Sequence, residues 1–191
     1  MPLLHGCVVG FDLGKKRGCN DAPTNDLNPV TRCFVHERLV SGHRLSEVLG
    51  AMLDAIRARG LKARVVRFRH TADTSFLGLS AARLAGSGIG IGIQAKGTAV
   101  IHQRGRQPHN NLELFSNAPI TRLEHYRALG ANAAAYALGE MPEPIVVPQR
   151  GEAMGSRYHA RVALIYAIET GLTEAGAAPE EVDVTLTGVK S

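Results

Sequence analysis

Residues 86–115 read GSGIGIGIQAKGTAVIHQRGRQPHNNLELF, and this stretch decides the fold expected around it. Glycine and isoleucine alternate over residues 88–93, and a second apolar run follows at residues 100–101. Between the two runs stands Gln-Ala-Lys-Gly, which contains Lys96. Alternation with a period of two residues, interrupted by such a tetrapeptide, predicts a strand, a tight turn that carries Lys96, and a second strand.

Glycine at alternate positions leaves one face of the first strand without side chains. Another group is therefore expected to approach the backbone closely on that face. One possible occupant is a helix packed against the sheet. The other is a large ligand that carries phosphate or amide oxygens, because the ammonium group of Lys96 lies close by in the sequence. The spacing of the residues alone leaves both alternatives open.

Helical and strand patterns alternate on both sides of this stretch. Apolar residues at helical spacing predict a helix with one buried face, formed by Leu45, Val48, Leu49, Met52 and Ile56. Gly60 stands where a helix C-terminal cap is expected, and residues 63–68 predict a buried strand. Thr71 or Asp73 is suited to cap a second helix.

The later part of the chain continues the alternation. Thr121 and Glu124 have the spacing of a capping box at the start of a helix. A last helix is expected over residues 156–175 and a strand over residues 182–186. Helices that alternate with short apolar strands predict an α/β fold, a Rossmann-like layered domain with a largely parallel sheet.

The first 43 residues have a different character, because KKRGCNDAPTNDLNP is polar, rich in turn-forming residues and without periodicity. We expect an irregular N-terminal arm over residues 1–43 with one or two short strands, at His5–Phe11 and Cys33–Leu39. The α/β domain is then expected over residues 44–191.

The formal charge is +5, and the basic side chains gather in one segment. They are Arg57, Arg59, Lys62, Arg64, Arg67 and Arg69. A nucleic-acid surface would suit the charge, but no aromatic residues are interleaved as stacking platforms. The pattern favours a solvated edge or a surface that meets an acidic partner, so no nucleic acid is predicted.

Other features of the sequence limit the expected cellular compartment and the expected cysteine and metal chemistry. No apolar run is long enough to span a membrane, and the N-terminus does not resemble a signal peptide, so a cytoplasmic location is expected. Cys7, Cys19 and Cys33 form no CxxC pair, which indicates reduced thiols. A zinc site with His36 and His43 is the weaker alternative, because structural zinc ligands usually come in close pairs. No metal site is predicted.

No catalytic motif is present: GxSxG, a P-loop and HExxH are all missing from the sequence. GSGIGIG has the wrong glycine spacing for a dinucleotide-binding fingerprint, and no helix is expected to open after it. The sequence therefore predicts no catalytic residue on this chain.

Longer segments carry a resemblance. IGIQAKGTAVIHQ, NNLELF and APITRLEHYRALGANAAAYA closely resemble the medium subunit of adenosylcobalamin-dependent diol and glycerol dehydratases. The resemblance begins near Leu61, extends to Ala137 and continues more weakly through SRYHARVALIYAIET.

The resemblance implies a subunit of a carbon–oxygen lyase that converts 1,2-diols or glycerol to aldehydes by a radical mechanism. It implies adenosylcobalamin as a cofactor shared with a large catalytic subunit, with this chain covering one side of it. The implied partners are the large and small dehydratase subunits, assembled as a dimer of heterotrimers.

The same resemblance implies cofactor contacts at Asp73, Lys96, Asn111, Ser116 and Tyr158. Asp73 would accept hydrogen bonds from corrin amide groups, and Lys96 would lie near the nucleotide tail. Each residue also has an ordinary structural interpretation: a helix cap for Asp73, turn residues for Lys96 and Asn111, and packing for Tyr158. Ser116 stands where familiar members have a proline beside the benzimidazole base, so a hydroxyl group would replace an apolar contact there.

Two alternatives from other functional classes are kept. The small subunit of a dehydratase-reactivating factor is non-enzymatic and has a related fold, but it lacks the Gln-Ala-Lys-Gly turn and the NLELF segment. A stand-alone basic binding module fits only the charge.

Overall fold

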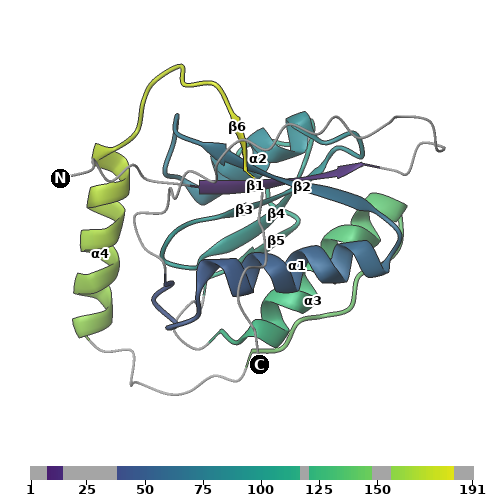
Figure 1. Ribbon diagram of the computed structural model, residues 1–191, viewed down its shortest axis with the longest axis horizontal. Coiled ribbons are helices and arrows are strands. Elements are labelled where there is room, and N and C mark those ends of the chain that lie inside the picture. Colours follow the sequence, from purple (N-terminus) through teal and green to yellow (C-terminus); the bar gives the residue numbers. More distant parts are fainter. Residues whose placement is uncertain (1–7, 15–37, 117–120, 148–155, 183–191) are drawn as a thin grey trace.

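The computed structural model describes residues 8–14, 38–116, 121–147 and 156–182, and for residues 8–14 and 156–159 it describes the main chain. Figure 1 shows the arrangement of the helices and strands. In chain order they are β1 (Val8–Gly14), α1 (Leu45–Ala58), β2 (Lys62–Phe68), α2 (Thr74–Leu84), β3 (Ile89–Ile93), β4 (Ala99–Gln103), β5 (Glu113–Phe115), α3 (Leu123–Leu138), α4 (Ser156–Gly171) and β6 (Glu180–Val182).

The six strands form one sheet with the order β5-β4-β3-β1-β2-β6, and every neighbouring pair is antiparallel. The α/β class is as expected, but the prediction of a largely parallel, Rossmann-like sheet is wrong. Both β2 and β3 pair with β1 in antiparallel register, so β2 and β3 run in the same direction with β1 between them. The connection through α2 is therefore a split β-α-β unit. A sequence pattern of alternating helices and strands does not reveal that a distant strand is inserted between two parallel ones.

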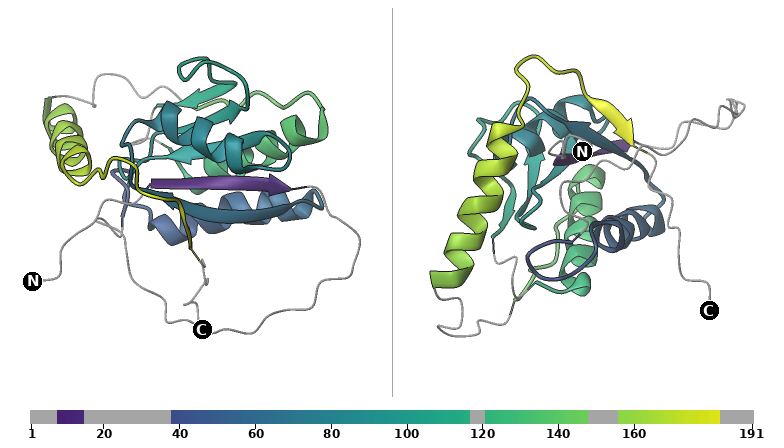
Figure 2. Two further views of the ribbon diagram at one scale, coloured as in Figure 1. Left: turned by 90° about the horizontal axis from the view of Figure 1, so that it is seen from above. Right: turned by 60° about the vertical axis from the view of Figure 1, so that its left-hand side comes forward.

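The helices cover both faces of the sheet. Helices α1 and α3 pack against each other on one face, and α2 packs on the other (Figure 2). The apolar stripe predicted for the first helix is buried as expected. Its members, Val48, Leu49 and Met52 among them, share one core with Ile91 of β3 and Leu129 of α3.

The alternation in β3 separates the two faces of the sheet. Its isoleucines join the α1–α3 core, and its glycines face α2. A Cβ atom added to Gly90 would lie 2.3 Å from the backbone nitrogen of Ala82, and one added to Gly92 would lie 2.4 Å from that of Gly78. Real Cβ atoms do not approach other atoms so closely. Helix α2, rather than a ligand, therefore occupies the bare glycine face.

Helix α3 begins one residue later than the expected capping box implies. The N-cap residue is Arg122 rather than Thr121, and the ring of His125 accepts a hydrogen bond from the Arg122 backbone N–H at 2.9 Å. The helix crosses α1 at Gly130, where an added Cβ would lie 2.6 Å from the carbonyl oxygen of Met52. Close contact between the two helix backbones therefore depends on this glycine.

The two ends of the described chain lie in the sheet. The first expected strand, His5–Phe11, is observed as β1 at Val8–Gly14, and it occupies an interior position between β2 and β3. The second expected strand, Cys33–Leu39, falls mostly outside the described residues. The domain boundary at residue 43 stays a prediction. The last strand is β6 at Glu180–Val182, slightly before the expected position, and residues 183–191 lie outside the described part.

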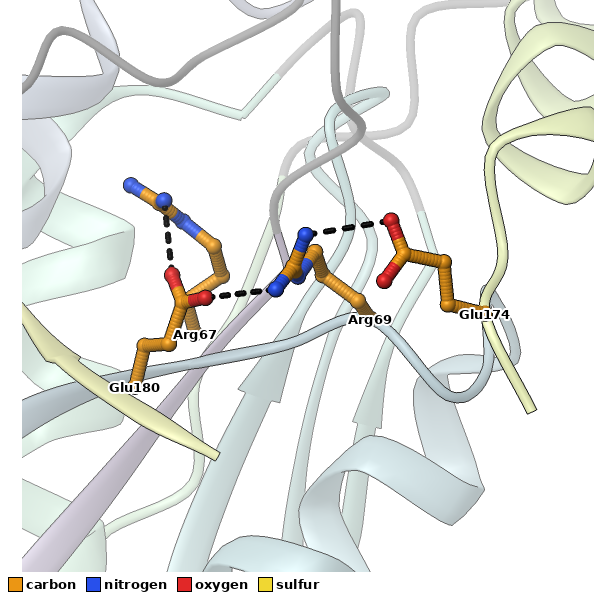
Figure 3. A network of polar contacts seen from close by, with 4 residues as sticks. All are labelled: Arg67, Arg69, Glu174 and Glu180. Atoms are coloured by element: carbon orange, nitrogen blue, oxygen red, sulfur yellow. Dashed lines mark hydrogen bonds and ion pairs between the residues drawn. The ribbon is translucent and has the colours of Figure 1, made fainter. Parts of the chain in front are cut away.

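The basic strand β2 finds acidic partners within the chain itself. Glu180 of β6 accepts hydrogen bonds from Arg67 at 3.1 Å and from Arg69 at 2.6 Å, and Glu174 accepts a further one from Arg69 at 3.0 Å (Figure 3). Glu181, the next residue along β6, pairs with Arg64 at 3.3 Å. An acidic partner was one interpretation of these basic side chains. Glutamates at residues 174–181 of the same chain form ion pairs with three of them.

Replacing Gly92 with alanine tests the contact between β3 and α2. The new methyl group would overlap the backbone of Gly78, so α2 must shift, and we expect Gly92→Ala to lower the free energy of unfolding by about 1–3 kcal/mol or more. The measurement is thermal or denaturant unfolding. Gly171→Ala is the matched control, because an added Cβ meets nothing within 4 Å there. Equal stability of the two variants would contradict the packing described here.

Removing Glu180 tests the ion-pair network in the same assay. Arg67 is buried, with its side chain 8% exposed, so Glu180→Ala leaves a buried cation without this carboxylate. We expect a loss of about 1–3 kcal/mol of unfolding free energy. Glu181→Ala breaks an exposed pair with Arg64 and should cost less than about 1 kcal/mol. A larger loss for Glu181→Ala than for Glu180→Ala would show that the network does not hold β6.

Candidate functional site

A cavity of about 470 Å³ lies where the N-terminus of α2, the turn between β3 and β4, and helix α4 come together. Its volume is typical of small-molecule sites. The lining consists of Asp73, Thr74, Ser75, Gln94, Lys96, Leu114, Val162, Ala163 and Tyr166. The cavity combines a carboxylate, a hydroxyl group, an amide and an ammonium group with an aromatic ring, and these come from segments far apart in the sequence.

Asp73 is positioned as the N-cap of α2. Its Oδ1 atom accepts hydrogen bonds from the backbone N–H groups of Ser75 at 2.8 Å and Phe76 at 3.1 Å. The Asp73 backbone N–H in turn donates to the hydroxyl group of Thr71 at 3.1 Å. Of the two capping candidates, Asp73 is therefore the cap. Asp73 also lines the cavity, so its structural role does not remove it from the candidate site.

Lys96 lies on the tight turn expected between the two strands. Within this turn the Gly97 N–H donates to the Gln94 carbonyl oxygen at 2.8 Å, and the Gln94 N–H donates to the Thr98 carbonyl oxygen at 3.0 Å. Gly97 has a φ of +96°, a conformation that favours glycine. The Lys96 ammonium nitrogen lies 5.6 Å from the centre of the Tyr166 ring, within the range of a cation–π interaction. The lysine therefore reaches the part of the cavity that α4 covers.

Glu169 of α4 is buried behind the turn, with 3% of its surface exposed. Its Oε1 atom accepts a hydrogen bond from the Ala95 backbone N–H at 2.9 Å. Burial raises the pKa of the Glu169 carboxyl, while the Ala95 hydrogen bond and the charge of Lys96 act in the opposite direction. The Oε2 atom is buried and has no hydrogen-bond partner among the described residues.

Two amide oxygens near the cavity also lack hydrogen-bond partners in the described part of the chain. They are Oε1 of Gln94 and Oδ1 of Asn111, and both are buried. The Gln94 amide nitrogen donates to the Ala72 carbonyl oxygen, and the Asn111 amide nitrogen donates to the Ser75 hydroxyl group at 3.1 Å. Buried polar atoms are usually paired. Gln94 is one of the residues that line the cavity, and its oxygen is an acceptor left unused beside it.

The structure brings some of the predicted site residues together and not others. Asp73 and Lys96 share the cavity, and Asn111 reaches it through Ser75. Ser116 is exposed at the end of β5 and is not part of the lining. Tyr158 lies in the first turn of α4, and its side chain is outside the description.

Most residues at or beside the cavity were not predicted as site residues, and Ser75, Gln94, Tyr166 and Glu169 are among them. Ser75 and Gln94 stand next to predicted ones in the sequence, so proximity to Asp73 and to Lys96 was an available signal. Tyr166 and Glu169 carried no such signal, because their positions on α4 come close to the turn only through the tertiary fold.

The polar side chains that line the cavity can bind a ligand through hydrogen bonds and charge. Among the described residues, no cluster of His, Cys, Asp and Glu side chains could hold a metal ion. Within the same ranges, none of the helices has the length and apolar character that crossing a bilayer requires.

His102 of β4 is fully buried, and its ring nitrogens face backbone carbonyl oxygens of Gln103, Gln107 and Pro108. It is a buried strand residue and takes no part in the cavity.

Comparison with known proteins places the chain in a family. A solved structure of a glycerol dehydratase reactivase is similar over 53% of this chain and 88% of that chain, with 18% sequence identity and a TM-score of 0.46. A likeness of this size carries no argument about function. The sequence model of the dehydratase medium subunit matches residues 28–143, which is more than half of the chain. The chain therefore belongs to the dehydratase medium subunit family and is one subunit of a multi-subunit dehydratase.

Proposed function

We propose that this chain helps to bind adenosylcobalamin in a dehydratase that acts on 1,2-diols or glycerol. The observation that carries the proposal is the cavity beside α2, where the Lys96 ammonium group lies together with the unpartnered buried oxygen of Gln94. Such a site selects a ligand that presents both an anionic group and N–H donors.

The residues present fit the proposed cofactor. Adenosylcobalamin carries carboxamide side chains around the corrin ring and a phosphate in its nucleotide tail. The oxygens of Asp73 and Gln94 can accept hydrogen bonds from carboxamide N–H groups, and Lys96 can donate to a phosphate oxygen. The cavity is far smaller than the whole cofactor, so this chain would cover only one side and a second subunit would cover the rest.

The division of labour follows from the side chains. When bound, adenosylcobalamin supplies the radical chemistry that converts a diol to an aldehyde. The residues of this chain bind and orient the cofactor and shield part of it from water. We assign the substrate pocket and the catalytic residues to a large subunit. This chain, the large subunit and a small subunit would form a heterotrimer. Two such heterotrimers would form a dimer in the cytoplasm.

Both alternatives are less well supported. The family match supports the dehydratase subunit, whereas the likeness to the reactivase structure is too weak to favour a reactivating factor. A basic binding module would need its arginines to be available, and Arg64, Arg67 and Arg69 form ion pairs with glutamates of the same chain.

Lys96→Ala tests the proposed site. Removing a charge-assisted hydrogen bond should weaken binding of adenosylcobalamin to the assembled complex by about 1–3 kcal/mol, or roughly 5- to 150-fold. The measurement is a spectroscopic titration of the complex with adenosylcobalamin. Lys62→Ala, on the exposed start of β2, removes the same charge away from the cavity and should leave the affinity unchanged. Unchanged affinity for Lys96→Ala would rule out this assignment.

The purified chain alone should have no dehydratase activity. The reason is that we assign the catalytic residues to the large subunit and a cofactor-binding surface to this chain. The assay supplies the chain with adenosylcobalamin and 1,2-propanediol and measures propionaldehyde, with the reconstituted complex as the positive control. Aldehyde formed by the chain alone would show that catalytic residues are present on it.

A further inference from the structure

The turn that carries Lys96 is held on both sides by buried side chains. The backbone N–H of Ala95 donates to Glu169 at 2.9 Å, and the hydroxyl group of Tyr126 donates to the Gly97 carbonyl oxygen at 2.8 Å. Glu169 belongs to α4 and Tyr126 to α3. Two helices therefore fix the residues that flank Lys96 directly.

Glu169 is also central to the way in which α4 meets the rest of the chain. Over residues 160–171, most side chains of α4 are exposed, and Ile165 and Glu169 are buried. Glu169 is 3% exposed and Ile165 is 8% exposed. These two positions are one helical turn apart, so they lie on the same face of α4. The contact between Glu169 and Ala95 therefore joins this face to the turn.

We propose that Glu169 is a positioning residue, which holds the Gln94–Gly97 turn so that Lys96 presents its ammonium group to an anionic part of the bound ligand. This inference deepens the proposed function and rests on it. It makes α4 a structural part of the binding site, although Glu169 itself does not line the cavity.

The physical reason lies in the flexibility of lysine. A long side chain on a loose turn loses much conformational freedom when it binds, and a turn that is held in advance reduces this loss. The hydrogen bond to Ala95, rather than the charge of Glu169, supplies the effect. The charge attracts the Lys96 ammonium group and repels an anionic ligand, so it does not by itself favour binding.

This distinction defines the variants. Glu169→Ala removes the acceptor for the Ala95 N–H, whereas Glu169→Gln retains an acceptor oxygen and removes the charge. We expect Glu169→Ala to weaken adenosylcobalamin binding to the reconstituted complex by roughly 3- to 10-fold, which is the scale of one hydrogen bond. Glu169→Gln should bind at least as tightly as the unaltered chain. Glu140→Ala is the matched control, because Glu140 forms an exposed ion pair with Arg59 outside the cavity.

A double variant shows whether Glu169 acts through Lys96. In a chain that already carries Lys96→Ala, a positioning residue for Lys96 has nothing left to position, so adding Glu169→Ala should not weaken binding further. A residue that only supports the fold would weaken binding in both backgrounds. Thermal unfolding of each variant is measured in parallel.

The outcomes separate the two proposals. Weaker binding for Glu169→Ala, restored by Glu169→Gln and absent in the Lys96→Ala background, supports the inference. If Lys96→Ala weakens binding and Glu169→Ala does not, the inference is wrong and the proposed site stands. Equal loss for Glu169→Gln and Glu169→Ala, or an added loss in the Lys96→Ala background, also overturns the inference. If Lys96→Ala has no effect, both proposals are wrong.

Discussion

The close contact between helix α2 and strand β3 is the constraint on which the rest of the structure depends. Gly78 of the helix and Gly92 of the strand meet backbone to backbone, at a distance that no side chain would permit. This contact brings the N-terminus of α2 to the end of β3, where the chain turns at Gln94–Gly97. Asp73 and Lys96 therefore line the same cavity because two glycines allow the elements that carry them to approach.

The electrostatic character of the site follows from how the other charges are arranged. The chain has a formal charge of +5, but the arginines of β2 and Arg69 just after it are paired with Glu174, Glu180 and Glu181. Lys96 belongs to none of these ion pairs, and its ammonium nitrogen lies 5.6 Å from the centre of the Tyr166 ring. Net charge is therefore a poor guide to the ligand. The local combination of an ammonium group with unpartnered amide oxygens is the informative feature.

The alternating isoleucines and glycines of β3 allow helices to pack on both faces of the sheet. Ile89, Ile91 and Ile93 join the core beneath α1 and α3, while Gly90 and Gly92 leave room for α2. The alternation and the bare face could be predicted from the sequence, because strand side chains point to opposite sides in turn. Whether a helix or a ligand filled that face could not be predicted, since both require the same absence of side chains.

The sequence by itself determined most of the local structure and the family. Periodicity predicted α1, β2 and the β3–β4 hairpin, since local spacing sets which face each element can bury. Long motifs identified the medium subunit and pointed to Asp73 and Lys96, which share one cavity. Only the tertiary structure decided that β1 lies between β2 and β3, which makes the sheet antiparallel. It alone placed Glu169 and Tyr166 beside the turn, because contacts between residues 70 or more positions apart depend on how whole elements pack.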